Sequence, residues 1–281
     1  MFIGANESIS KGFSKAVINS LSIGSNALQV FLRTPMRNTP IKIKDDEFTK
    51  VLNLLSENNS QCVVHSSYLY NFSKPNNEVD WCINNMKEEL TYCDKFNGIG
   101  CIIHMGKHLK LSKDEAFQNY IDNINLITNE LQTNSKLILE NSASQGTEIG
   151  NKIEDLARIY EGIIEKEKVG FCLDTCHLFA SGYDLSQPEI SKNVINEFDE
   201  KIGLEKLLVI HLNDSKKDCG CHVDRHENLE CGKINLQGLK TFVQTLREKN
   251  YQGLIILETP KDDNETRQKE VSLIKSWLYN Q

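Results

Sequence analysis

The chain has 281 residues, of which 39% are hydrophobic and 25% are charged, and its 39 acidic residues outnumber its 32 basic ones to give a formal net charge of −7. This composition is too apolar for a disordered chain, and no apolar run reaches the length of about 18 residues that a membrane-spanning helix needs. Net positive charge cannot hold a nucleic acid to this chain, so any positive potential that binds DNA or RNA must be local.

The cysteines and the N-terminus indicate a cellular compartment. Nine cysteines, an odd number, occur in a chain whose first residues, Met1-Phe2-Ile3-Gly4, lack the basic and apolar regions of a leader. We therefore expect a reduced, intracellular protein, cytoplasmic or nuclear, with no signal peptide and no transmembrane segment. No stretch is rich enough in proline, serine or glycine to be a linker, so residues 1–281 are predicted to form a single domain.

A short apolar run, a loop and an amphipathic stretch recur along the chain. Apolar runs of this kind are typical of strands buried on both faces, and Phe117, Tyr120, Ile121 and Ile124 show the helical spacing between two of them. In chain order the predicted strands are Phe2–Ala5, Ala27–Leu32, Gln61–His65, Gly100–His104, Lys136–Glu140, Val169–Asp174, Leu207–Leu212 and Leu254–Glu258. Eight strands alternating with helices predict a (β/α)8 TIM barrel with its active site at the C-terminal rim of the strands. A doubly wound open sheet is the rival fold, but Gly4 begins no G-x-G-x-x-G phosphate turn.

Six of the eight predicted strands have an imidazole or a carboxylate at or beside their carboxyl end. These residues are His65, His104, Glu140, Asp174, His211 and Glu258. The carboxyl ends of barrel strands converge on one rim, where so many charged groups would be costly to bury without partners. Mixed nitrogen and oxygen ligands are typical of Zn²⁺, Mn²⁺ or Fe²⁺.

Three more candidate ligands follow in the loops, namely His177, Asp224 and His226. Nine ligands are too many for one tetrahedral metal ion and about right for three. Two or three metal ions a few ångströms apart are typical of enzymes that hydrolyse phosphoesters.

Thiolate sites are weaker candidates. A site at Cys172 and Cys176 is disfavoured, because we expect Cys172 to point into the strand core while Asp174 faces the rim. The segment Cys219–His222 offers two thiols and an imidazole but lacks the second cysteine pair of a zinc ribbon.

Several segments resemble the signatures of the endonuclease IV family of apurinic/apyrimidinic (AP) endonucleases. They are residues 65–71 (HSSYLYN), 140–141 (EN) with 145–146 (QG), 170–177 (GFCLDTCH), 180–184 (ASGYD), 211–216 (HLNDSK) and 223–226 (VDRH). The resemblance runs from Ile3 to Thr259 and implies a (β/α)8 barrel with three Zn²⁺ ions. Such an enzyme hydrolyses the phosphodiester 5′ to an abasic site in double-stranded DNA and leaves a 3′-hydroxyl and a 5′-deoxyribose phosphate. We also expect 3′-end-cleaning phosphodiesterase activity and a monomeric protein.

The resemblance assigns roles to the nine ligands. His65, His104 and Glu140 would hold the first zinc; Glu140, Asp174, His211 and Glu258 the second; and His177, Asp224 and His226 the third. Water or hydroxide shared by the first two ions is the expected nucleophile, with Glu258 placed to orient or deprotonate it, so Glu258 and the bridging Glu140 are the expected catalytic residues. Asn213 and Asp214 would fix imidazole tautomers behind the ligands, or else cap the loop.

The resemblance also points to DNA contacts. Tyr68 and Leu69 match side chains that enter the duplex in this family, the alternative being that they pack under the loop as core residues. Arg37 matches a third such side chain, but its loop is one residue longer than the family spacing, which makes Arg33 the other candidate.

The alternative function is that of a divalent-metal sugar isomerase or epimerase of the xylose-isomerase-like barrels, which shares the rim ligands but uses one or two ions. The trio His177, Asp224 and His226 separates the two, because such isomerases have no need of it. A DNA-binding protein that had lost catalysis would have a broken ligand set, and this set is complete. Three Zn²⁺ ions against four ligand carboxylates would leave the site with a charge of about +2, so even this acidic chain would present positive potential to a phosphate.

Overall fold

The computed structural model describes residues 1–260 and 263–279, in which eight parallel strands close into a barrel. Each strand pairs with the next in the order β1, β2, β3, β4, β5, β6, β7 and β10, and β10 pairs with β1. The strands span Phe2–Asn6 (β1), Ala27–Phe31 (β2), Gln61–His65 (β3), Gly100–His104 (β4), Lys136–Glu140 (β5), Val169–Asp174 (β6), Leu207–His211 (β7) and Leu254–Leu257 (β10). The predicted (β/α)8 TIM barrel is therefore confirmed.

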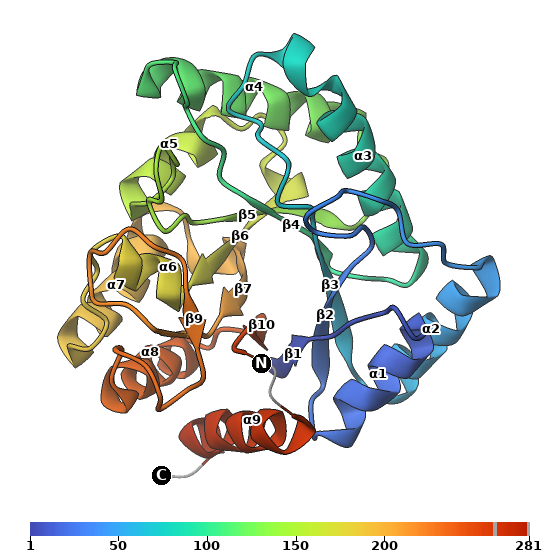
Figure 1. The fold of residues 1–281 in the computed structure, drawn as a ribbon, viewed down its shortest axis with the longest axis vertical. Coiled ribbons are helices and arrows are strands. Elements are labelled where there is room, and N and C mark those ends of the chain that lie inside the picture. Colours follow the sequence, from blue (N-terminus) through green and yellow to red (C-terminus); the bar gives the residue numbers. More distant parts are fainter. Residues whose placement is uncertain (261–262, 280–281) are drawn as a thin grey trace.

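Helices follow the strands and surround the barrel as an outer ring (Figure 1). They span Phe13–Ser22 (α1), Asp45–Glu57 (α2), Asn76–Lys95 (α3), Lys113–Glu130 (α4), Ile153–Gly162 (α5), Thr175–Ala180 (α6), Pro188–Lys201 (α7), Leu236–Glu248 (α8) and Asn264–Tyr279 (α9), with 3-10 turns at Lys166–Lys168 and Leu204–Lys206. Helix α4 begins with a capping box between Ser112 and Glu115. Within the described ranges, no helix combines the length and the apolar character that crossing a membrane requires.

Four strands have the predicted bounds, and the other four differ by one residue at their carboxyl ends. Two of these differences concern the site. Strand β7 ends at His211 rather than Leu212, and β10 ends at Leu257 rather than Glu258. The backbone N–H of Glu258 donates to the side-chain Oδ1 of Asn213 at 2.9 Å, which takes Glu258 out of the strand ladder.

Two apolar layers hold the barrel together. The layer inside the barrel consists of Ala27, Val63, Ile102, Ile138, Cys172, Val209, Leu254 and Ile256. The larger layer lies between strands and helices and buries rings such as those of Phe13, Tyr120 and Phe171. Gly4 allows close packing of β1 on β2, because a Cβ there would lie 1.8 Å from the carbonyl oxygen of Ala27. The filled interior leaves the rim as the place for polar side chains.

The loops after β6 and β7 carry additional short elements at the rim. Helix α6 starts directly after β6, and the side chain of Asp174 caps it by accepting from the backbone N–H of His177 at 2.9 Å. Asp214–Ser215 (β8) and His226–Glu227 (β9) form a two-stranded antiparallel sheet after β7. These elements place His177 and His226 beside the strand ends.

Candidate metal centre

All nine predicted ligands belong to overlapping groups of side chains at the C-terminal rim. In the described part of the chain, the groups whose ligand atoms lie within 4.8 Å of one another include His65, His104 and Glu140; Glu140, Asp174, His211 and Glu258; Asp174, His177 and His226; and Cys176, Asp224 and His226. The last two of these share His226 and are together called the third group. Glu140 belongs to the first two groups, and Asp174 to the second and third. The groups therefore form one continuous cluster.

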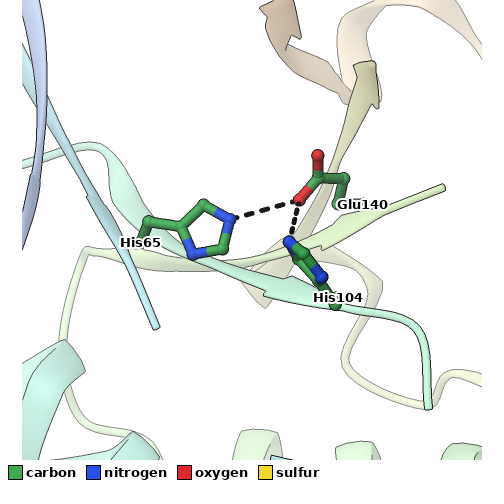
Figure 2. Close-up of side chains that lie close together, drawn as sticks. All are labelled: His65, His104 and Glu140. Atoms are coloured by element: carbon green, nitrogen blue, oxygen red, sulfur yellow. Dashed lines mark hydrogen bonds and ion pairs between the residues drawn. The ribbon is translucent and has the colours of Figure 1, made fainter. Parts of the chain in front are cut away.

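The first group comes from the ends of three adjacent strands. The Nε2 atoms of His65 and His104 each lie 3.3 Å from the same oxygen of Glu140, Oε2 (Figure 2). Zinc bonds of about 2.0–2.1 Å in a tetrahedron place neighbouring ligand atoms about 3.3 Å apart. These three side chains thus have the spacing of a zinc site.

The third group has the same spacing. His177 Nε2 lies 3.3 Å from Asp224 Oδ2, and His226 Nε2 lies 3.1 Å from Asp224 Oδ1 and 3.4 Å from Asp174 Oδ2. The buried Nε2 of His226 nevertheless forms no hydrogen bond. A buried nitrogen left without a hydrogen bond between two carboxylates fits a shared cation.

The second group brings three carboxylates around one imidazole. His211 Nδ1 lies 2.8 Å from Glu140 Oε1, 3.2 Å from Glu258 Oε2 and 3.8 Å from Asp174 Oδ2. Burial would raise the pKa of Glu140, but the imidazoles of His211 and His104 hold that pKa well below its usual range. Buried carboxylates this close repel one another unless positive charge lies between them, so this group also suits a cation.

Four of the five imidazoles are held from behind through their second ring nitrogen. The contacts are His65 Nδ1 to the carbonyl oxygen of Ser66 (2.9 Å), His177 Nδ1 to that of Asn141 (2.9 Å), His226 Nδ1 to that of Glu258 (3.4 Å), and His211 Nε2 to Gln29 Oε1 (2.7 Å). A carbonyl oxygen only accepts, so each of these nitrogens carries the proton and leaves the other nitrogen free to ligate.

The side chains of Asn213 and Asp214 hydrogen-bond to groups other than the imidazoles whose tautomers they were expected to fix. Asn213 Nδ2 instead donates to Asp174 Oδ2 at 2.7 Å, and its Oδ1 accepts from the backbone of Glu258. Asn213 therefore orients two carboxylate ligands. The carboxylate of Asp214 accepts from three backbone N–H groups of its own loop, those of Ser215, Gly232 and Ile234. Asp214 thus has the loop-capping role, because short acidic side chains readily reach nearby backbone N–H groups.

Cys172 lies in the apolar core and Asp174 at the rim, as expected, but the two side chains do not alternate between faces. Residues two apart on a strand point to the same side, so Cys172 shares the inner face of β6 with Asp174, and its thiol lies within 4.8 Å of ligand atoms of Glu140 and His211. Burial raises the pKa of this thiol to about 12, which keeps it neutral. Cys219 is exposed, and neither it nor Cys221 belongs to any potential metal-ligating group in the described ranges.

The loop after β3 carries two exposed apolar side chains, one of which contacts the cluster. Tyr68 and Leu69 are 46% and 45% exposed, so they are not the core residues that the alternative interpretation required. The ring of Tyr68 lies 5.1 Å from that of His104. Its backbone N–H and the hydroxyl of Ser67 both donate to the carbonyl oxygen of Pro35, which ties this loop to the one after β2.

The two candidate arginines differ in their surroundings, because Arg33 is buried and ion-paired while Arg37 is exposed. Arg33 is 6% exposed; its Nε lies 3.1 Å from Glu89 Oε1, and it also pairs with Glu88. Entering a duplex would break both ion pairs and leave Glu89 buried without its cation. Arg37 is exposed on the same loop and remains the candidate.

Arg33 is therefore expected to contribute to stability. In Arg33→Met, the carboxylate of Glu89, which is 1% exposed, keeps the hydrogen bond from the Tyr70 hydroxyl but loses its cation. We expect the free energy of unfolding to fall by about 3 kcal/mol at pH 8. Burial raises the pKa of Glu89 to about 7 in the parent. Ionising this carboxyl in the folded protein therefore lowers the free energy of unfolding as the pH rises from about 4.5 through 7. Without Arg33 the ionised carboxylate lowers the free energy of unfolding further. At pH 5 the carboxyl is protonated, so the variant should lose less stability relative to the parent than it does at pH 8.

Urea unfolding at both pH values measures this effect. Lys50→Met, which removes an ion pair to Asp46 whose side chains are both more than half exposed, is the control and should cost less than about 1 kcal/mol. Equal losses in the two variants would show that Arg33 is no more than a surface charge.

Comparisons with known proteins identify the family of this chain. Residues 19–279 match the family described as xylose isomerase-like TIM barrel. A putative endonuclease 4 of Acanthamoeba polyphaga mimivirus is 37% identical, with 98% of this chain and 93% of the relative covered. The crystal structure of endonuclease IV from Thermus thermophilus superposes with a TM-score of 0.84 at 26% identity over the full length of both chains. A D-tagatose 3-epimerase-like protein has a TM-score of 0.75 at 18% identity over 99% of this chain and 97% of that one, which shows a shared fold alone.

Proposed function

This chain belongs to the endonuclease IV family of the xylose isomerase-like TIM barrels, and on that premise we propose that it is a DNA-repair endonuclease that hydrolyses the phosphodiester 5′ to an abasic site. The proposed products are a 3′-hydroxyl and a 5′-deoxyribose phosphate, and the same hydrolysis at a blocked 3′ end would clean that end. The observation that carries the proposal is the group formed around His177, Asp224 and His226, which a sugar isomerase has no need of.

We propose three Zn²⁺ ions for the cluster. His65, His104 and Glu140 would hold the first, Glu140, Asp174, His211 and Glu258 the second, and His177, Asp224 and His226 the third. Zinc, when bound, lowers the pKa of its water towards neutrality and stabilises negative charge on an attacked phosphate. All nine proposed ligands lie in this one chain, so the proposed centre needs no residue from a second subunit.

The exposure of the ligands indicates where the phosphate would approach. The side chains of His104 and Asp224 are 33% and 37% exposed, whereas those of His65, Glu140 and His211 are buried. Solvent and substrate therefore reach the cluster between His104 and Asp224.

Glu258 is the proposed general base. Its Oε1 accepts from Gln29 Nε2 at 2.6 Å, while its Oε2 faces His211 Nδ1 at 3.2 Å. One oxygen is thus fixed by a hydrogen bond, and Oε2 is directed to the cluster, where it can orient the attacking water and accept its proton.

We propose that Tyr68, Leu69 and Arg37 enter the duplex at the abasic site. An abasic nucleotide has no base to unpair, so turning it towards the cluster costs little. An apolar side chain can fill the space left in the base stack, and Leu69 is an exposed apolar side chain.

Leu69→Ala is expected to raise KM for an abasic duplex about 10-fold, because it removes a side chain that would be buried on binding. Thermal stability should remain that of the parent, since Leu69 lies outside the core. Leu126→Ala, which shortens an exposed leucine on the outer helix α4, is the matched control and should leave KM unchanged. An unchanged KM in Leu69→Ala would remove Leu69 from the DNA contact.

Incision of a duplex with a single abasic analogue tests the proposed function. We expect the zinc-loaded protein to nick the strand 5′ to the lesion, to leave the undamaged duplex intact, and to lose activity on prolonged treatment with a zinc chelator. An intact abasic strand after incubation with metal-replete protein, or epimerisation of a ketohexose by that protein, would contradict the proposal.

A further inference from the structure

Gln29 is a buried amide at the base of the cluster and belongs to none of the three ligand groups. It lies in the middle of β2, is 0% exposed, and pairs in register with Asn6 on β1 and Val63 on β3. Its neighbour two residues before, Ala27, belongs to the apolar layer inside the barrel. Burying an amide beside such a layer is unfavourable unless its polar atoms are hydrogen-bonded.

The side chain of Gln29 meets that need through two groups of the cluster. Its Oε1 lies 2.7 Å from His211 Nε2, and its Nε2 lies 2.6 Å from Glu258 Oε1. These contacts join β2 to the ends of β7 and β10, on the other side of β1. No other amide in the described residues bridges an imidazole ligand and a carboxylate ligand.

Only one orientation of the Gln29 amide satisfies both contacts. If the amide were turned over, its oxygen would face an oxygen of the Glu258 carboxylate and its NH₂ group would face His211. The observed orientation gives the carboxylate a donor and gives the imidazole an acceptor. An acceptor at Nε2 requires the proton on Nε2, so Nδ1, which lies beside Glu140 and Glu258, is the nitrogen that a cation bound there would take as its ligand.

We propose that Gln29 is a positioning residue for the second zinc position and for the general base. Its oxygen selects the tautomer of His211 that presents Nδ1, and its NH₂ group holds Oε1 of Glu258 so that Oε2 faces the cluster. The kinetic part of this inference rests on the proposed function, whereas its metal-binding part does not.

Gln29→Met and Gln29→Glu separate the two contacts. Methionine has a similar length and removes both hydrogen bonds, so we expect the affinity for one of the three zinc ions to fall about 10- to 100-fold, with a similar fall in kcat and KM within about 2-fold. Glutamate keeps an acceptor for His211 but replaces the donor to Glu258, so we expect zinc affinity within about 3-fold of the parent and a kcat reduced at least about 10-fold.

Zinc affinity is measured by competition with a chromophoric chelator, and kcat and KM by incision of an abasic duplex. Asn123→Leu is the matched control, because Asn123 is another buried amide, 1% exposed, that donates to the carbonyl oxygens of Phe72 and Lys74 away from the cluster. It should bind zinc as the parent does.

Parent-like zinc affinity and kcat in Gln29→Met would overturn the proposal, and so would an equal loss of zinc affinity in Asn123→Leu. If Gln29→Met does not fold, Gln29→Glu decides: a reduced kcat with zinc retained supports the role of Gln29, and an unchanged kcat overturns it. A parent protein that does not incise abasic DNA would refute the proposed function, while the zinc titrations would still decide the role of Gln29.

Discussion

Glu258→Gln is expected to lower kcat for abasic-site incision about 10³- to 10⁴-fold while binding of the duplex remains measurable. A glutamine amide cannot accept the proton of the attacking water. The new NH₂ group can take the place of either carboxylate oxygen. In the place of Oε1 it would face the NH₂ group of Gln29, which lies 2.6 Å from Oε1 in the parent, and in the place of Oε2 it would face the cluster beside His211. Both placements replace an attraction with a repulsion.

Single-turnover incision and a duplex-binding titration together measure this effect. Glu227→Gln is a suitable control, because Glu227 is a partly buried carboxylate on β9 that pairs with Lys216 rather than with the cluster. It should turn over at close to the parent rate. Near-normal turnover in Glu258→Gln would remove Glu258 from the mechanism.

Asp224→Asn is expected to lower kcat/KM for incision roughly 10²- to 10³-fold and to release one zinc ion per chain. Asp224 spans the third group, since its two oxygens lie 3.3 Å from His177 Nε2 and 3.1 Å from His226 Nε2. Burial raises the pKa of Asp224, but the imidazoles of His177 and His226 hold it well below its usual range. The carboxylate is therefore ionised in the parent, and replacing it with the neutral amide of asparagine removes this negative charge.

The matched control for this variant is Asp218→Asn, which changes an exposed carboxylate in the same loop. Its zinc content and rate should equal those of the parent. Full activity with one zinc ion fewer in Asp224→Asn would show that the third group takes no part in hydrolysis, as expected of an isomerase-like centre.

The barrel, and the gathering of the candidate ligands at its rim, could be predicted because both depend on local sequence. Continuous apolar runs such as Gly100–His104 and Lys136–Glu140 form strands with the predicted bounds. The fold then brings the residues at the strand ends together without further information, since all parallel strands of a barrel end on one rim.

The supporting contacts could not be predicted, because they join residues far apart in the chain. Gln29 was recognisable only as one polar residue in the apolar run Ala27–Phe31, and its partners lie 182 and 229 residues away. Likewise, the loop sequence does not show that Asn213 reaches Asp174 while Asp214 turns back to its own backbone.

The two arginines show the same limit. Arg33 and Arg37 lie on one loop, and their spacing alone did not separate them. The separation comes from α3, a distant helix that places Glu88 and Glu89 against Arg33. The partner of a charged side chain is set by tertiary packing, which the loop sequence does not contain.

A metal count by native mass spectrometry of the intact protein decides whether nine residues of this chain form a three-metal centre, as we propose. The geometry of the three overlapping groups predicts three Zn²⁺ ions per chain, and two in Asp224→Asn. One or two Mg²⁺ or Mn²⁺ ions in the parent protein would contradict this proposal and favour an isomerase.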